Sequence, residues 1–276
     1  MSLGGDEAYA VQPEPVARAH ILAIANQKGG VGKTTTAINL ATALAAAGRR
    51  ALIIDLDPQG NASTGLGIER ARRRLSSYSL LRGEAELTAA ALPTAVSGLW
   101  VVPASEELSG AEFEFMDRER REFLLRRVIR AQAEAWDEVL IDCPPSLNLL
   151  TINALVAADK VLVPLQCEFY ALEGLSQLLR TIERVRQALN LRLEIEGVLL
   201  TMYDGRNNLS QSVAADVRAH FGTRVFTTMI PRNVRVSEAP SHGQPVLLYD
   251  RRSAGAQAYV ELAGEILQRS AGRPRS

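Results

Sequence analysis

The sequence predicts an α/β protein with a single doubly wound, mostly parallel sheet flanked by helices. Three observations support this fold class. Short apolar runs alternate with longer segments in which apolar residues recur at helical spacing. A glycine-rich loop joins the first apolar run to the first helical segment. Two later runs end in aspartate, and open α/β sheets bind their ligands at the carboxyl ends of the strands.

Length and composition are typical of an ordinary globular chain. The 276 residues are 47% hydrophobic and 22% charged, which allows a large core. Basic and acidic residues number 31 each, so no overall positive charge points to nucleic acid. Two cysteines, Cys143 and Cys167, are too few for a disulfide framework and favour a reducing compartment. No run approaches the roughly 18 apolar residues of a membrane span, and the acidic N-terminal stretch does not resemble a signal peptide. We therefore expect a cytoplasmic protein.

The predicted elements alternate along one domain. Residues 1–18 lack periodicity and are predicted to be a disordered tail, 19–270 the folded domain, and 271–276 a flexible basic tail. Strands are predicted at 21–25, 51–54, 99–102, 139–141, 161–164, 195–200 and 225–230. Helices are predicted at 37–47, 118–130, 168–189, 208–220 and 254–268, with loops and short helices over 60–97. The six arginines within 118–130 are expected on a solvated helix face, and Lys160 at the surface.

The loop between the first predicted strand and helix reads Asn-Gln-Lys-Gly-Gly-Val-Gly-Lys-Thr-Thr. In this setting a Gly-Lys-Thr sequence predicts a phosphate-binding loop, because glycines let successive N–H groups converge on an anion at the positive end of a helix. Lys33 is expected to reach the β- and γ-phosphates, and the Thr34 hydroxyl to bind Mg²⁺. The predicted contacts are Lys28, Gly29, Gly30, Val31, Gly32, Lys33, Thr34 and Thr35.

This loop departs from the general pattern G-x-x-x-x-G-K-[ST] at its start. Gln27 replaces the first glycine, and a second lysine, Lys28, precedes the glycine pair. The chain has only three lysines, and two of them lie in this loop. An ammonium group is a compact point charge that fits a phosphate cradle, whereas a guanidinium is a planar fork. The pattern therefore favours phosphate binding by Lys28 over a lysine on a surface turn.

Three aspartates follow predicted strands. Asp55 and Asp57 come after the strand at 51–54 and face the same side, because they are two residues apart. Asp142 comes after the strand at 139–141. A buried strand that ends in aspartate is typical of the second acid of P-loop enzymes, which binds Mg²⁺ directly or through water. For the first pair a solvated turn is the alternative, since Asp-Pro often begins a turn.

Four blocks together resemble the ParA/MinD family of deviant P-loop ATPases, and most closely its ParA/Soj chromosome-partitioning branch. They span 28–35, 55–61, 140–146 and 230–235, and read KGGVGKTT, DLDPQGN, LIDCPPS and IPRNVR. The resemblance extends from about residue 20 to the C-terminal helix, which is nearly the whole chain. The combination is far more specific than any single block.

The resemblance implies a deviant P-loop fold, with ATP and Mg²⁺ as cofactors, and a role for each matching residue. Lys28, Lys33 and Asp57 are the implied catalytic residues, with Asp57 orienting the attacking water. Lys28 is implied to cross to the partner subunit's phosphates in an ATP-sandwich homodimer. The implied metal site comprises Thr34, Asp55 and Asp142. The implied nucleotide contacts beyond the phosphate loop are Asp57, Met202, Pro231 and Asn233.

The resemblance further implies non-specific binding of double-stranded DNA, nucleoid association, and slow hydrolysis stimulated by a ParB-type centromere-binding partner. The cargo, chromosome or plasmid, stays open. Residues 201–252 contain seven arginines and four acidic residues, which gives this segment a net charge of +3. A solvated surface is the usual explanation for such an excess. A dimer would double this patch and could present a stripe for phosphates. The expected DNA contacts are Arg206, Arg218, Arg235 and Arg251.

The main alternative is a MinD-like, membrane-associated division-site ATPase. It requires an amphipathic C-terminal helix with bulky apolar anchors. The residues beyond the helix predicted at 254–268 are small or polar and offer no such anchors. An iron–sulfur reductase is disfavoured because Cys143 lies within the predicted phosphate site. A small-molecule synthetase on this scaffold is disfavoured because no added substrate domain is evident.

Overall fold

The computed structural model describes residues 19–169 and 171–271. The tail predicted at 1–18, and all but the first residue of the one predicted at 271–276, lie outside them. Within the described residues, seven strands form one sheet in the order β3-β4-β2-β5-β1-β6-β7. The strands are β1 (His20–Ile24), β2 (Ala51–Asp55), β3 (Leu92–Pro93), β4 (Leu99–Val102), β5 (Glu138–Asp142), β6 (Lys160–Gln166) and β7 (Glu194–Thr201). All neighbouring strands are parallel except β3 and β4.

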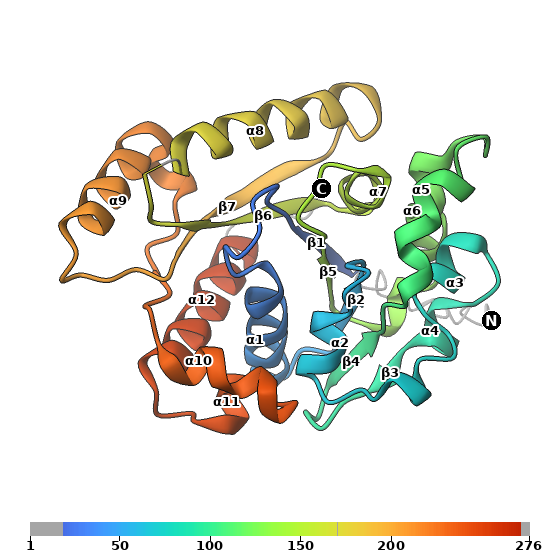
Figure 1. Ribbon diagram of the computed structural model, residues 1–276, viewed down its shortest axis with the longest axis horizontal. Helices are drawn as coiled ribbons and strands as arrows, with labels where there is room; N and C mark the ends of the chain where they lie inside the picture. Colours follow the sequence, from blue (N-terminus) through green and yellow to red (C-terminus); the bar gives the residue numbers. More distant parts are fainter. Residues whose placement is uncertain (1–18, 170, 272–276) are drawn as a thin grey trace, which may run out of the picture.

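Helices cover both faces of the sheet (Figure 1), so the predicted doubly wound fold is confirmed. One layer contains α3 (Ser77–Arg82), α4 (Leu87–Ala90), α5 (Ala111–Glu114), α6 (Leu124–Gln132), α7 (Leu149–Ala157), α8 (Ala171–Ala188) and α9 (Asn208–Phe221). The other contains α1 (Lys33–Ala46), α2 (Asn61–Gly65), α10 (Val234–Glu238), α11 (Val246–Tyr249) and α12 (Ala254–Ala271). Among the helices described, none has the length and apolarity needed to cross a bilayer.

The central strands of the sheet are buried on both faces. A parallel sheet covered on both faces buries every residue of its inner strands, which therefore appear as continuous apolar runs. All five residues of β2 and of β5 are buried. Their register pairs Asp55 with Asp142, so the last residues of two adjacent strands lie side by side. The phosphate-loop sequence leaves β1 at the same edge of the sheet.

The prediction of a strand at 225–230 is wrong. The segment runs beside β7 and makes only isolated bridges, with Val225 opposite Val198 and Pro231 opposite Tyr203. Between these bridges the N–H groups of Thr227 and Thr228 donate to the Glu265 carboxylate of α12, at 3.0 and 3.1 Å. A side chain thus takes two donors that a regular ladder would use, and the segment stays irregular.

We expect Glu265→Ala to lower the free energy of unfolding by about 1–2 kcal/mol, because two backbone donors lose their acceptor and Arg269 loses its ion-pair partner, 2.8 Å away. Urea unfolding at neutral pH measures the change. Glu261→Ala, on the exposed side of the same helix, serves as the control and should change stability by less than about 0.5 kcal/mol. Equal effects of the two substitutions would contradict the assigned role of Glu265.

Candidate nucleotide-binding site

The glycine loop lies between β1 and α1 and ends in an open helix start. Gly30 and Gly32 have φ values of 74° and 85°, a left-handed conformation that glycine adopts without strain. No side chain caps the first turn of α1, and no acidic residue occurs in it. The free N–H groups and the helix dipole therefore present a positive surface to an anion.

Lys33 is the first residue of α1 and is only 6% exposed. Its Nζ donates to the backbone carbonyl of Lys28 at 2.9 Å, across the loop. Burial lowers the pKa of Lys33, and the nearby Asp142 carboxylate partly offsets that effect. An ammonium group has three donors, so a buried lysine with one hydrogen bond among the described residues can still bind an incoming anion.

Asp142 is fully buried, and neither of its carboxylate oxygens has a hydrogen-bond partner within the described residues. Burial raises the pKa of Asp142 well above its ordinary value, and the charge of neighbouring Asp55 raises it further. The Thr34 hydroxyl is near enough to lower this pKa in part, although it does not make a well-formed hydrogen bond. Buried, unpartnered carboxylate oxygens are unfavourable unless a cation binds them.

Asp55 differs from its neighbour because both of its oxygens are in use. Ser63 donates to Oδ2 from its backbone N at 2.9 Å and from its hydroxyl at 2.7 Å, and the Asp57 N–H donates to Oδ1 at 3.2 Å. Burial raises the pKa of Asp55 to about 6, while these hydrogen bonds act in the opposite direction. Asp55 thus holds α2 and the turn that carries Asp57.

The donor set fits magnesium that arrives with a nucleotide. Among residues 19–169 and 171–271, no group of three or more His, Cys, Asp or Glu side chains is arranged to hold a metal by itself. Mg²⁺ usually takes one or two protein oxygens and completes its shell with water and phosphate oxygens. Asp142, with its unpartnered oxygens, and the adjacent Thr34 hydroxyl match that requirement.

Asp57 lies at the rim of the same region and is 8% exposed. Its Oδ1 accepts a hydrogen bond from the Gln59 N–H at 3.0 Å, and its backbone carbonyl accepts one from Gly60 at 2.8 Å. The tight turn fixes the carboxylate, while its second oxygen has no partner among the described residues. This geometry leaves an acceptor free for a water molecule.

A cavity of about 240 Å³ adjoins the loop and brings together the remaining predicted contacts. It is lined by Gly32 and Thr35 of the loop together with Met202, Pro231 and Asn233. Met202 has a φ of 51°, a strained value for a residue with a side chain. The Asn233 Oδ1 accepts from the Val236 N–H at 3.3 Å and begins α10, while its amide nitrogen has no acceptor among the described residues.

Several residues that support the site were not identified from the sequence. The Thr201 hydroxyl donates to the carbonyl of Val31 at 2.9 Å and ties β7 to the loop. Tyr259, from α12, lines the cavity, and its hydroxyl lies 3.4 Å from that of Thr36. Glu168, just after β6, forms an ion pair with the Lys28 ammonium. No local signal marks these residues, because each partner is distant along the chain.

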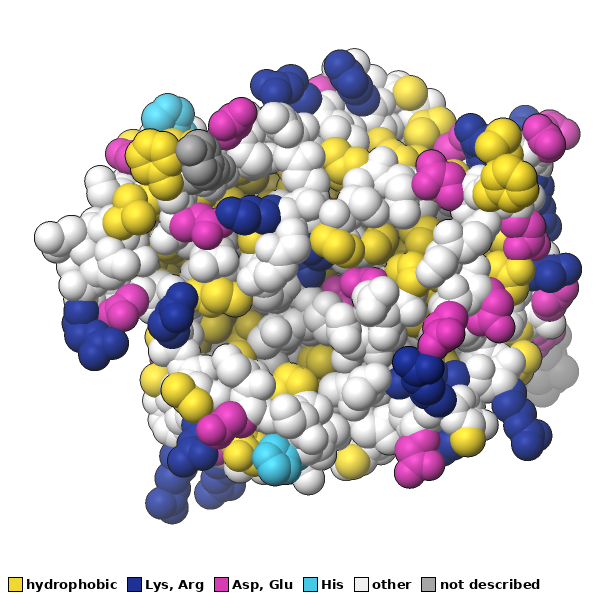
Figure 2. All heavy atoms as spheres, viewed as in Figure 1, with side chains coloured by type: hydrophobic (Ala, Val, Ile, Leu, Met, Phe, Trp, Pro, Cys, Tyr) yellow, Lys and Arg dark blue, Asp and Glu magenta, His cyan; other side chains and the backbone are white. Residues whose placement is uncertain are grey.

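The four arginines expected to bind DNA differ in their ion pairing and lie on different elements. Arg206 is paired with Asp204 at 3.1 Å, and Arg235 with Glu238 at 3.0 Å. Arg218 and Arg251 make no ion pair within the part of the chain that the structure describes, and they lie on α9 and before α12. Figure 2 shows acidic and basic side chains interspersed over the visible face, without a continuous basic area.

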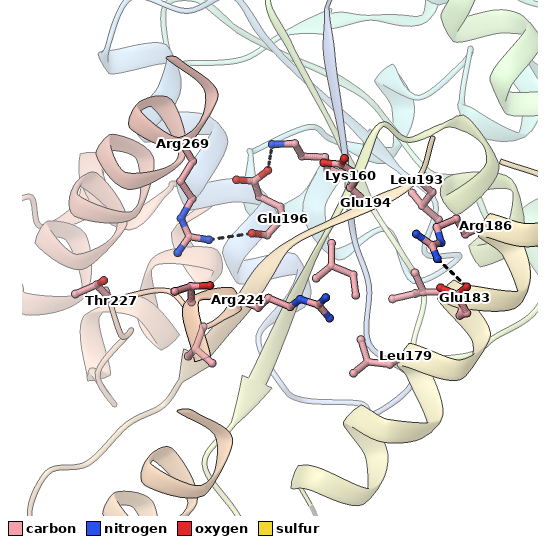
Figure 3. A pocket seen from close by; sticks show the side chains of 14 residues that line it. Lys160, Leu179, Glu183, Arg186, Leu193, Glu194, Glu196, Arg224, Thr227 and Arg269 are labelled. Carbon is pink, nitrogen blue, oxygen red and sulfur yellow. Dashed lines mark hydrogen bonds and ion pairs between the residues drawn. The ribbon is translucent and has the colours of Figure 1, made fainter. Parts of the chain in front are cut away.

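A larger cavity, of about 840 Å³, lies elsewhere, at the amino ends of β6 and β7 (Figure 3). None of the predicted site residues lines it. It contains Lys160, whose side chain is only 13% exposed and forms an ion pair with buried Glu196. The predicted surface position of Lys160 is therefore wrong. Arg269 donates to the Glu196 carbonyl at 2.9 Å and lies over the Phe226 ring.

The chain is similar to several known proteins. A family model described as an AAA domain matches residues 19–195. The chromosome partitioning protein ParA of Caulobacter vibrioides is 64% identical over 256 residues, covering 92% of this chain and 96% of the relative. The sporulation initiation inhibitor protein Soj of Bacillus subtilis is 54% identical over 246 residues, covering 89% and 97%.

A solved structure with this fold is that of cobyrinic acid a,c-diamide synthase from Mycobacterium smegmatis with bound ADP and magnesium. Its sequence is 39% identical to this chain, and the two structures superpose with a TM-score of 0.81. The match covers 92% of this chain and 96% of the synthase chain. The identities to the ParA and Soj proteins are higher, over a similar share of the chain. The chain belongs to the ParA/Soj family of chromosome-partitioning ATPases.

Proposed function

We propose that this chain hydrolyses ATP with Mg²⁺ and uses the cycle to partition a chromosome or plasmid. The observation that carries the proposal is the pair formed by Lys33 and Asp142 at the glycine loop. A buried ammonium with unused donors lies beside a buried carboxylate with two unpartnered oxygens. A triphosphate and its magnesium would satisfy both groups together.

Each residue has a distinct task in this proposal. The loop N–H groups and Lys33 bind the phosphates, and Thr34 and Asp142 hold Mg²⁺. Asp55 lies next to Asp142 in the sheet and accepts hydrogen bonds from Ser63. When bound, the metal neutralises charge on the β- and γ-phosphates. Asp57 holds the attacking water through its free oxygen. The cavity beside Met202, Pro231 and Asn233 takes the adenine. Bound ADP and magnesium in the Mycobacterium smegmatis relative support this ligand class.

Lys28 is the residue that we propose to act between subunits. It belongs to the loop but points to Glu168 of its own chain, and about half of its side chain is exposed. If the Lys28 ammonium left Glu168 for the phosphates of a partner subunit, it would exchange an ion pair with one carboxylate for a stronger interaction with several negative charges. The ATP-bound form would then be a homodimer, and hydrolysis would end the shared contact.

The dimer would bind double-stranded DNA without sequence preference and associate with the nucleoid, and a ParB-type partner would accelerate hydrolysis. Names of the ParA and Soj relatives support the partitioning role. Arg206, Arg218, Arg235 and Arg251 remain the proposed DNA contacts, with Arg218 and Arg251 contributing most because they have no ion-pair partner among the described residues. Such binding should weaken steeply with salt.

ATP turnover and gel filtration of the wild type, Lys28→Ala and Asp57→Ala test the proposal. Asp57→Ala should lower turnover about a hundredfold and still bind ATP, because only the water loses its acceptor. With ATP it should elute as a long-lived dimer. Lys28→Ala should retain some nucleotide binding and elute as a monomer. A Lys28→Ala protein that dimerises normally with ATP would disprove the role between subunits, and full turnover by Asp57→Ala would disprove the water-positioning role.

The alternative of a MinD-like membrane ATPase receives no support from α12. The apolar residues Tyr259, Leu262 and Ile266 are buried in the domain core, so they are not available as membrane anchors in this structure. Pelleting with anionic liposomes in the presence of ATP separates the two functions. Co-sedimentation that depends on ATP would favour the alternative.

A further inference from the structure

The arginine-rich segment 118–130 divides into two groups in the structure. Arg118 donates to two backbone carbonyls at the end of α3, each at 3.1 Å, and Arg121 donates to the carbonyl of Met116 at 2.7 Å. These two side chains hold neighbouring segments together. The solvated helix face expected from the sequence is therefore not a uniform surface.

The other four arginines line one cavity of about 410 Å³ with a single aromatic residue. Its residues are Arg120, Phe123, Arg126, Arg127 and Arg130, which we call the arginine pocket. The spacing explains why they converge, since residues three or four apart along η3 (Arg121–Phe123) and α6 are neighbours on the helix surface. The pocket shares no residue with the nucleotide-binding site.

Arg130 is incompletely satisfied. Its Nη2 lies 2.6 Å from the Asp159 carboxylate and also donates to the carbonyl of Ala157 at 3.3 Å. Its Nε and Nη1 are buried and have no hydrogen-bond partner within the described residues. A buried donor without an acceptor is unfavourable, and a guanidinium has no uncharged form to adopt at neutral pH.

The other three arginines of the pocket have little or no charge compensation, whereas Arg130 is paired with Asp159. Arg126 and Arg127 make no ion pair among the described residues. Arg120 lies 4.0 Å from Glu119, but the two side chains are 71% and 94% exposed, so water and salt screen the pair. Like charges one turn apart destabilise a helix, as with Arg126 and Arg130. A bound anion would relieve this repulsion and accept hydrogen bonds from the guanidinium groups that line the pocket.

The pocket has the chemistry of a site for a small polyphosphate. Its volume falls in the range of roughly 300–1,000 Å³ typical of small-molecule sites. Guanidinium forks match phosphate oxygens in pairs, and the Phe123 ring offers a face for a planar ring. The flanking residues Asp117, Glu119 and Glu134 are exposed acids, which shorten the basic surface and disfavour a long polyanion such as duplex DNA.

We infer that the arginine pocket binds a small organic anion that carries at least two phosphates and a planar ring, the chemistry of a nucleoside polyphosphate. The site is additional to the proposed ATP site and does not depend on it. The Asp159 carboxylate that pairs with Arg130 also accepts from the N–H of Ile21, at 3.0 Å, in the strand that leads to the glycine loop.

The test is isothermal titration of the full chain with guanosine diphosphate and, separately, with inorganic pyrophosphate. One molar equivalent of ADP per chain, with constant free magnesium, fills the nucleotide-binding site and leaves little free ADP to compete for the arginine pocket. Both probes should bind saturably, and the double variant R126Q/R127Q should weaken both by about tenfold or more. Phe123→Leu should weaken guanosine diphosphate several-fold and leave pyrophosphate unchanged, because only the ring uses the aromatic face.

R180Q/R184Q is the matched control, since it removes two exposed arginines of α8 that lie outside the pocket. It should bind both probes as the wild type does, and thermal melts should show that every variant is folded. The inference is overturned if no saturable binding occurs at millimolar probe, or if both double variants lose affinity equally. It is also overturned if R126Q/R127Q loses binding to a short DNA duplex or an acidic peptide while neither small anion binds the wild type.

Discussion

Lys33→Ala should not bind ATP at concentrations that saturate the wild type, and its turnover should fall by at least about a thousandfold. The ammonium is buried at the start of α1, where water cannot replace it and where the helix dipole already favours an anion. The substitution also removes the donor to the Lys28 carbonyl and so loosens the loop itself. Equilibrium binding of a slowly hydrolysed ATP analogue measures the loss.

Lys33→Arg distinguishes charge from shape. It keeps the positive charge but places a planar fork where the loop accommodates a compact ammonium, so it should also lose most of its ATP affinity. Without ligand, Lys33→Ala should be no less stable than the wild type in urea, because a desolvated lysine opposes folding. ATP affinity of Lys33→Ala within about threefold of the wild type would show that the phosphates bind elsewhere.

Asp142→Asn is expected to abolish magnesium-dependent turnover and, in the absence of ligand, to stabilise the fold. Burial raises the folded-state pKa values of Asp142 and of Asp55, the latter to about 6, so the folded protein holds protons that the unfolded chain has released. Stability without ligand therefore falls as pH rises from about 4 through these folded-state values. The asparagine variant loses one of the two buried charges and should be more stable by about 1–3 kcal/mol at pH 7.

Urea unfolding at pH 5 and pH 7.5, with and without ATP and magnesium, checks this prediction. Without ligand the advantage of the variant should grow with pH. With ligand the order should reverse, because only the wild type gains the binding free energy of the complex. An asparagine variant that is less stable than the wild type at pH 7.5 without ligand would mean that Asp142 already has a favourable partner.

The parts of the site that the sequence predicted are those encoded within a few residues. The glycine loop, Lys33 and Thr34 are contiguous, and a strand that ends in aspartate places Asp55 and Asp142 wherever parallel strands finish together. The cavity beside the glycine loop was only partly predictable. Met202 and Pro231 matched a family pattern, but Tyr259 reaches the cavity from α12 and carries no local signal.

Two of the wrong predictions share a physical cause, which is a partner that is distant in sequence, whereas the third has a local cause. The residues at 225–230 favour a strand, yet Glu265 takes two of their N–H groups. A lysine at the start of a strand is usually solvated, yet Lys160 is paired with Glu196 thirty-six residues later. The helix predicted from 118 begins as α6 only at Leu124, after Arg121 has bonded to a preceding carbonyl.

Both margins of the sheet are closed, and this limits how molecules of this protein can meet. On one side β3 is only two residues long and includes Pro93; on the other, the segment at 225–230 runs beside β7, and Arg269 binds the Glu196 carbonyl of that strand. Neighbouring copies cannot readily join strands into a larger, permanent array. The homodimer that we propose would therefore associate through the loop-bearing rim, where its contacts can form and dissociate with each cycle.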